Sequence, residues 1–207
     1  NYDLRYEWFM NPGEIISIGG FYKVFHNAIE ETIIPSASET FRTFTNATGI
    51  ANTYGIEFEI RKNLDFISSS FKYFSLNSNL SLINSQITVE QTGKLDKRTM
   101  WGQSPYSFNL GLFFFQPDWG TSFNIQGRRI VAVANINQYQ FTDPHIYELP
   151  RNMLDITLSQ ELVDNLEIKF TARDIFNDKL IFEQGGKIVT SNWGGRKIGL
   201  SLGYKFK

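Results

Sequence analysis

Two glutamates, Glu57 and Glu59, have the spacing best suited to acid–base chemistry in this sequence. Alternate residues of a β-strand share a face, so a strand through them would place two carboxylates side by side, as hydrolysis by paired acids requires. The simpler interpretation is that both are solvated on a wet strand face, because glutamate is rarely buried. We favour this interpretation and predict that the chain is not an enzyme.

Other reactive groups give no stronger signal. His26 and His145 have no second histidine or acidic residue at metal-ligand spacing, and there is no cysteine, so we expect neither a metal site nor a cofactor. The segment QTGKLDK lacks the glycine spacing of a phosphate-binding loop, and no serine lies in a nucleophile elbow. A net charge of −1 gives no indication of nucleic-acid binding.

Candidate ligand-binding residues are cations and aromatics near the longer predicted connections. Arg128 and Arg129, in GRRI, could draw an anionic ligand into a lumen, or could instead pair with carboxylates and brace whatever fills it. Aromatic side chains could stack on a ligand or partner, and packing on one another explains them equally well. These aromatics are Trp101, Tyr139, Phe141 and Tyr147.

The elements that carry these residues are predicted from a strict alternation of apolar and polar side chains, which is typical of strands with two different faces. The C-terminal RKIGLSLGYKFK shows it clearly. About nine strands and no helix are expected, with residues 35–49 as an exposed loop. The strands are predicted at 2–8, 15–33, 53–64, 74–89, 104–115, 120–132, 151–162, 166–175 and 196–206.

The connections between these strands alternate in length. Short connections are expected at 10–14, 62–66, 116–120 and 161–165, and long ones around 34–48, 90–103, 133–150 and 177–195. Outer-membrane barrels have short periplasmic turns and long extracellular loops. A soluble lipocalin-like barrel alternates equally well with its apolar face turned inward, so alternation alone leaves both open.

Three features favour lipid against the apolar face. The strands are about ten residues long, as a tilted bilayer crossing needs. Aromatic residues gather at the short-turn ends, and charges of both signs lie deep in the opposite face, including Asp3, Arg5, Glu7, Glu57, Glu59, Arg61, Glu167, Lys169 and Arg173. The residues predicted to face lipid are Tyr54, Ile56, Phe58, Ile60, Tyr106, Phe108, Leu110, Leu154, Ile156, Leu158, Leu166, Ile168, Phe170, Ile198, Leu200, Leu202, Tyr204 and Phe206.

Several stretches together resemble a known family along nearly the whole chain. They are NYDLRYEWFMNPGEIISIGGFYKVFHNAIEETI, YGIEFEIRKNLDFI, WGQSPYSFNLGLFF, GRRI, YELPRNMLDITLSQEL and ARDIFND. In this order they resemble the last third of the barrel of TonB-dependent outer-membrane receptors, especially the Bacteroidota type. The resemblance implies an all-β, antiparallel, up-and-down transmembrane barrel segment, with residues 1–207 supplying about nine of roughly 22 strands.

The same resemblance implies a role and partners. The whole protein would import a scarce nutrient (siderophore, vitamin, glycan or peptide) across the outer membrane of a Gram-negative bacterium. Its partners would be membrane lipid, the rest of the barrel and its plug, TonB through an N-terminal region outside this sequence, and a surface lipoprotein lid. Two alternatives remain open: a structural or secretion-associated barrel that serves as a platform for partner proteins, and a soluble small-molecule carrier.

Overall fold

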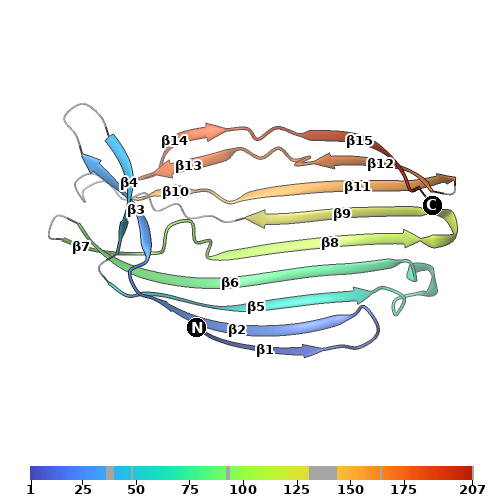
Figure 1. Cartoon of the computed structure of the whole chain (residues 1–207), viewed down its shortest axis with the longest axis horizontal. Coiled ribbons are helices and arrows are strands. Elements are labelled where there is room, and N and C mark those ends of the chain that lie inside the picture. The colour runs from blue at the N-terminus through green and yellow to red at the C-terminus, as the bar shows by residue number, and fades with distance from the viewer. Residues whose placement is uncertain (36–39, 48, 92–93, 131–143, 164, 207) are drawn as a thin grey trace.

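The protein is a single-layer antiparallel β-structure (Figure 1). The computed structural model describes residues 1–35, 40–47, 49–91, 94–130, 144–163 and 165–206. Nine strands run side by side in one sheet, and β7 (Lys94–Arg98) extends it by pairing with β6. In spatial order the nine are β1 (Tyr2–Trp8), β2 (Ile15–Phe25), β5 (Ala51–Asn63), β6 (Phe74–Gln91), β8 (Tyr106–Gln116), β9 (Thr121–Ile130), β11 (Arg151–Val163), β12 (Leu166–Arg173) and β15 (Lys197–Tyr204).

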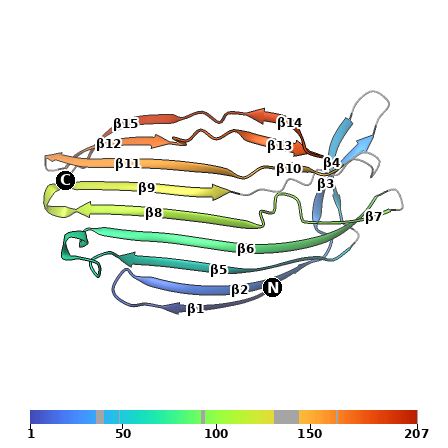
Figure 2. The same ribbon diagram turned by 180° about the vertical axis from the view of Figure 1, so that it is seen from behind.

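The two ends of the sheet differ. At one end, which we call the short-turn end, tight connections join successive strands, two of them through the 3-10 helices η1 (Ser69–Phe71) and η2 (Pro117–Trp119). At the other, the long-connection end, the chain makes longer excursions between strands (Figures 1 and 2). Each of the nine predicted strands therefore has a counterpart in the sheet, with one of them shorter than predicted, and the alternation of short and long connections is confirmed. No helix in the described residues is long and apolar enough to cross a membrane.

The long connections contain strands that the sequence patterns missed. The predicted strand 15–33 is wrong, because the backbone turns at Asn27 (φ 55°) and β3 (Ile29–Pro35) leaves the sheet. β3 pairs with β4 (Thr40–Asn46), inside the segment predicted as a loop. A further sheet joins β10 (Ile146–Glu148), β13 (Leu180–Gln184) and β14 (Lys187–Asn192). The Thr and Phe of β4 favour strands by residue type, without an apolar–polar alternation to reveal it.

The register gives the sheet two chemically distinct faces. Directly opposed residues share a face, and the pairings Phe58↔Leu80 and Leu80↔Phe108 are followed across the sheet by Phe170↔Leu200. We call this the apolar face; every strand residue predicted to face lipid lies on it. Phe206 follows β15, with its ring 5.0 Å from that of Tyr204. The alternate positions form the polar face, which carries all nine charged residues predicted for it.

The sheet has almost no core of its own. The buried apolar cluster is Ala47, Ala51, Ile87 and Val89, at the long-connection end. There the hairpin β3–β4 is attached to the sheet by an ion pair between Arg98 Nη1 and Glu30 Oε2 (2.7 Å), whose side chains are each 2% exposed. Elsewhere large apolar side chains stand in the open, as Leu200 does at 72% exposure. The apolar face therefore needs a cover from outside the chain.

Candidate polar-face site

A charged cluster lies on the polar face across β1, β2 and β5. Arg5 donates from Nη2 to Glu59 Oε2 (2.7 Å) and contacts Glu7 Oε1 through Nε (2.7 Å). Arg61 lies 3.5 Å from the other oxygen of Glu59. Both carboxylate oxygens of Glu59 are thus engaged by arginines. Glu57 and Glu59 do share a strand face, as predicted, but of the two only Glu57 has no hydrogen-bond or ion-pair partner among the described residues, so the pair is poorly arranged for hydrolysis.

Amide side chains continue this surface across β6, β8 and β9. Asn109 Nδ2 donates to Asn79 Oδ1 over 2.7 Å. A cavity of about 170 Å³ beside them is also lined by Arg61, Asn77 and Gln126. The Oδ1 atom of Asn77 is shielded from solvent and has no hydrogen-bond partner within the part of the chain that the structure describes. The polar face therefore has hydrogen-bonding groups available for a ligand or a protein segment that packs against it.

Arg128 and Arg129 do not form a cationic pair on one face. Arg128 holds a polar-face position opposite Asn109, and its side chain is outside the described part of the structure. Arg129 lies on the apolar face, because neighbouring strand residues alternate. Its Nε donates to the Tyr106 hydroxyl (3.1 Å) and its Nη1 to Asn152 Oδ1 (3.3 Å). The expectation of a cationic pair on one face is therefore wrong for Arg129, and Arg128 stays a candidate by its register position alone.

The candidate aromatic residues are dispersed. Trp101 is exposed in the connection between β7 and β8, and Tyr147 is exposed on β10 with its ring 6.4 Å from that of His145. No ring contact joins Trp101 to Tyr147 within the described ranges. Tyr139 and Phe141 lie outside the described residues. The structure thus places two of these four aromatics at the long-connection end without gathering them.

Two polar clusters in the structure were not predicted from the sequence. One is at the short-turn end, where the buried Glu14 carboxylate accepts hydrogen bonds from Lys62 Nζ (2.8 Å), Asn11 Nδ2 (2.7 Å) and the Asn63 amide (3.0 Å). The hydrogen bond from Lys62 is the largest influence and, with those from Asn11 and Asn63, lowers the pKa of Glu14 although burial opposes this. Glu14 thereby fastens the first turn to the end of β5.

The other cluster lines a cavity of about 260 Å³ on the polar face, between the end of β12 and the start of β15. Its charged residues are Arg151, Asp155, Arg173, Asp174 and Lys197. Only their register brings them together, and no local motif marks it. Among the described residues no group of three or more histidine or acidic side chains is arranged to hold a metal ion.

These features define a class of protein. A single antiparallel sheet with one apolar face, one charged face, and turns at one end opposite long connections at the other is a segment of a transmembrane β-barrel wall. The sheet is open, with β1 and β15 as its edges. The chain belongs to the TonB dependent receptor-like, beta-barrel family, whose model matches residues 1–175. This family comprises outer-membrane receptors and transporters of Gram-negative bacteria rather than enzymes, which places the chain in that membrane.

Solved structures agree with this fold. The chain is similar to the FrpB iron transporter from Neisseria meningitidis (F3-3 variant), with 15% identity, a TM-score of 0.69, and coverage of 99% of this chain and 30% of that one. It is also similar to a mutant of the ferric enterobactin receptor PfeA from Pseudomonas aeruginosa, with 14% identity, a TM-score of 0.59, and coverage of 97% and 29%. The chain thus spans under a third of the length of both. No curated protein matches it.

Proposed function

We propose that residues 1–207 form the C-terminal wall of a plugged barrel of about 22 strands that imports a scarce nutrient with energy delivered through TonB. The observation that carries this proposal is the pair of continuous faces, apolar and charged, that extends over nine strands. The resemblance of the sequence stretches to Bacteroidota receptors supports that type. We assign no catalytic role to the chain.

In this proposal the apolar face meets lipid. Its side chains are exposed over the whole width of the sheet, which water would penalise and hydrocarbon would favour. Exposed aromatics lie at both of its boundaries, as an interfacial girdle requires. Tyr2, Tyr22 and Tyr54 stand in one row toward the long connections, and Trp8, Trp119 and Tyr204 lie near the short turns.

The polar face would then line the lumen and contact the plug. The Arg5–Glu59 cluster and the unpartnered Asn77 oxygen supply the charges and acceptors that a plug surface can use. Arg128, Trp101 and Tyr147 are our candidates for ligand contact toward the long-connection end, where a surface lipoprotein lid would also dock. TonB would act through an N-terminal region outside this sequence.

Ferric chelates are the first class of cargo to test. The two similar structures are named as an iron transporter and a ferric enterobactin receptor, so ferric chelates are the first cargo to test, before vitamins, glycans and peptides. The experiment measures accumulation of each labelled cargo in cells with the full-length gene intact, deleted, or combined with loss of TonB. We expect one class to require both genes.

A different outcome would favour the alternative. Unchanged uptake of every cargo class after deletion, together with co-purification of the barrel with a surface or secreted protein, would replace the import function by that of a platform for partners.

A further inference from the structure

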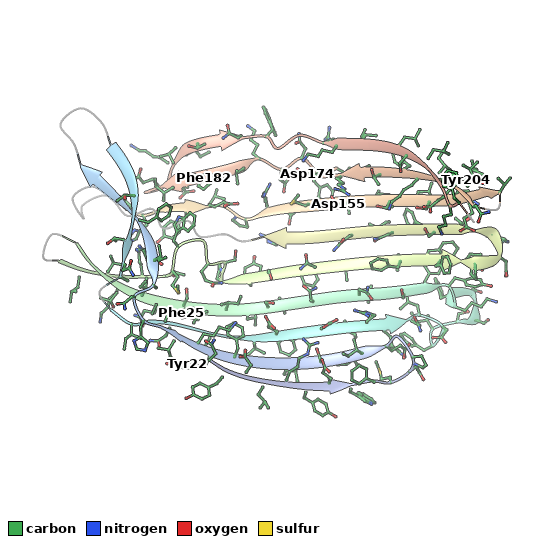
Figure 3. All side chains as sticks on the ribbon, in the orientation of Figure 1. Tyr22, Phe25, Asp155, Asp174, Phe182 and Tyr204 are labelled. Atoms are coloured by element: carbon green, nitrogen blue, oxygen red, sulfur yellow. The ribbon has the colours of Figure 1, made fainter. Side chains whose placement is uncertain are left out.

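The cavity of about 260 Å³ on the polar face lies where two neighbouring strands end together. β12 stops at Arg173 and β15 begins at Lys197, and the wall is completed by Arg151 and Asp155 of β11 and by Asp174. Figure 3 shows Asp155 and Asp174 next to each other at this point, and the Asp174 amide donates to Asp155 Oδ1 over 2.8 Å. The charged side chains of the wall are three cations and two carboxylates.

Two of the three cations of this wall, Arg173 and Lys197, have no anionic partner among the described residues. Arg173 and Lys197 are directly opposed across β12 and β15, an arrangement of like charges that destabilises a sheet unless something lies between them. Neither forms an ion pair with a carboxylate of the described residues. Arg151 forms an ion pair with Glu148 (Nε to Oε1, 4.0 Å), but its Nε is shielded from solvent and has no hydrogen-bond partner in the described part of the chain. An anion in the cavity would pair with Arg173 and Lys197 and accept a hydrogen bond from Arg151 Nε.

One oxygen of Asp174, in the same wall, lacks a hydrogen-bond donor. Asp174 is only 7% exposed, and its Oδ1 has no hydrogen-bond partner in the described part of the chain. Its backbone is held by the bond to Asp155 and by a left-handed conformation (φ 53°), so the carboxylate has little freedom to reach water. A buried acceptor of this kind is normally satisfied, so a donor is expected beside it.

We propose that this cavity is a subsite for a hydroxycarboxylate group of the cargo. The carboxylate lies among Arg151, Arg173 and Lys197, and the hydroxyl on the neighbouring carbon donates to Asp174. A neutral hydroxyl suits the site better than an ammonium group, because an ammonium group would face three cations. The assignment rests on the proposed function, since it requires cargo to pass along the polar face.

The test compares L-lactate with propionate, which carry the same charge and differ by the hydroxyl. Binding is measured by NMR titration of the full-length receptor in detergent micelles. We expect lactate to bind about tenfold more tightly than propionate, because propionate leaves Asp174 unpaired. Lys197→Met should weaken both by about tenfold through loss of a charged hydrogen bond. Asp174→Ala, or Asp174→Asn if the first variant does not fold, should reduce the difference between the two acids.

The matched control is Lys169→Met, on the neighbouring strand β12 and on the same face but outside the cavity, which should leave both affinities unchanged. Equal affinity for the two acids, or an equal effect of Lys169→Met and Lys197→Met, would overturn the subsite. Failure of both acids to bind would also overturn the subsite. In that case a cross-link from Lys197→Cys to the plug would show that the plug itself occupies the cavity. The titration needs neither TonB nor uptake. Binding without uptake would therefore count against import alone, and uptake without binding against the subsite alone.

Discussion

Arg5 on β1 reaches Glu59 on β5 across the intervening strand, with 2.7 Å between Nη2 and Oε2. The residue of β2 directly opposite Arg5 is Gly19, and the Arg5 side chain passes over it. A Cβ at Gly19 would lie 3.7 Å from Arg5 Cβ and Cγ, an ordinary contact. Charges on β1 and β5 are thus joined because the strand between them presents no side chain.

Two glycines of the polar face should respond differently to alanine. At Gly55 a Cβ would stand 2.5 Å from the Leu82 carbonyl oxygen and 2.8 Å from the Phe21 ring, so Gly55→Ala should cost about 1–3 kcal/mol of unfolding free energy. Gly19→Ala should stay within about 0.5 kcal/mol. Denaturant unfolding of the full-length barrel in lipid vesicles measures both. Similar effects at the two sites would show that the contacts around Gly55 relax freely.

The orientation of the two faces can be tested at adjacent residues of β15. Leu200→Arg places a charge on the apolar face near the middle of the strand and should cost about 2–4 kcal/mol of barrel stability if that face meets hydrocarbon. Ser201→Arg places the same charge on the polar face, where water can solvate it, and should cost far less. Refolding free energies in lipid vesicles decide between them. A larger loss at Ser201 would mean that the apolar face packs against protein.

The buried ion pair at the long-connection end should hold the hairpin β3–β4 in place. Glu30→Ala would remove the carboxylate that lies 2.7 Å from Nη1 of the buried Arg98, and breaking a buried ion pair in this way typically costs about 3–5 kcal/mol. We expect limited proteolysis of intact cells to cut within residues 26–50 of this variant, while the barrel stays folded. Leu95→Ala on β7, where the side chain is 67% exposed, is the control and should remain uncut. If the Glu30→Ala variant resists the protease, the ion pair does not hold the hairpin β3–β4 in place.

Acid should loosen the first turn through Glu14. Its pKa is lowered in the folded chain, chiefly by the hydrogen bond from Lys62, so its contribution to stability is present above the usual glutamate value of about 4.3 and is lost as pH falls through the lowered value. Unfolding midpoints of wild type and Glu14→Gln should differ at pH near 7 and converge in acid. Curves that stay parallel down to low pH would contradict the assignment.

Period-two alternation was sufficient to predict the nine sheet strands, because each strand has one face in each environment. It failed in the long connections, where β4 and β14 carry no such contrast. Strand geometry also separates Arg128 from Arg129, although their adjacency in GRRI suggested a pair. Glu14 and Lys62 are 48 residues apart, and Asp174 and Lys197 meet only through the register of β12 and β15, so no local pattern could reveal either contact.

A wall one layer thick, with four buried apolar residues in the core cluster of its described part, has a consequence for how its sequence can change over time. What each strand residue tolerates is set by what lies outside the chain on its own side. In the proposed function, hydrocarbon accepts one apolar residue for another, whereas the opposite side must match a particular plug and cargo. Related barrels that adopt new cargoes should therefore accumulate substitutions at every second position of the strands. Along one strand, the chemical character of the residues would then change slowly at the positions of the apolar face and quickly at the alternate positions of the polar face.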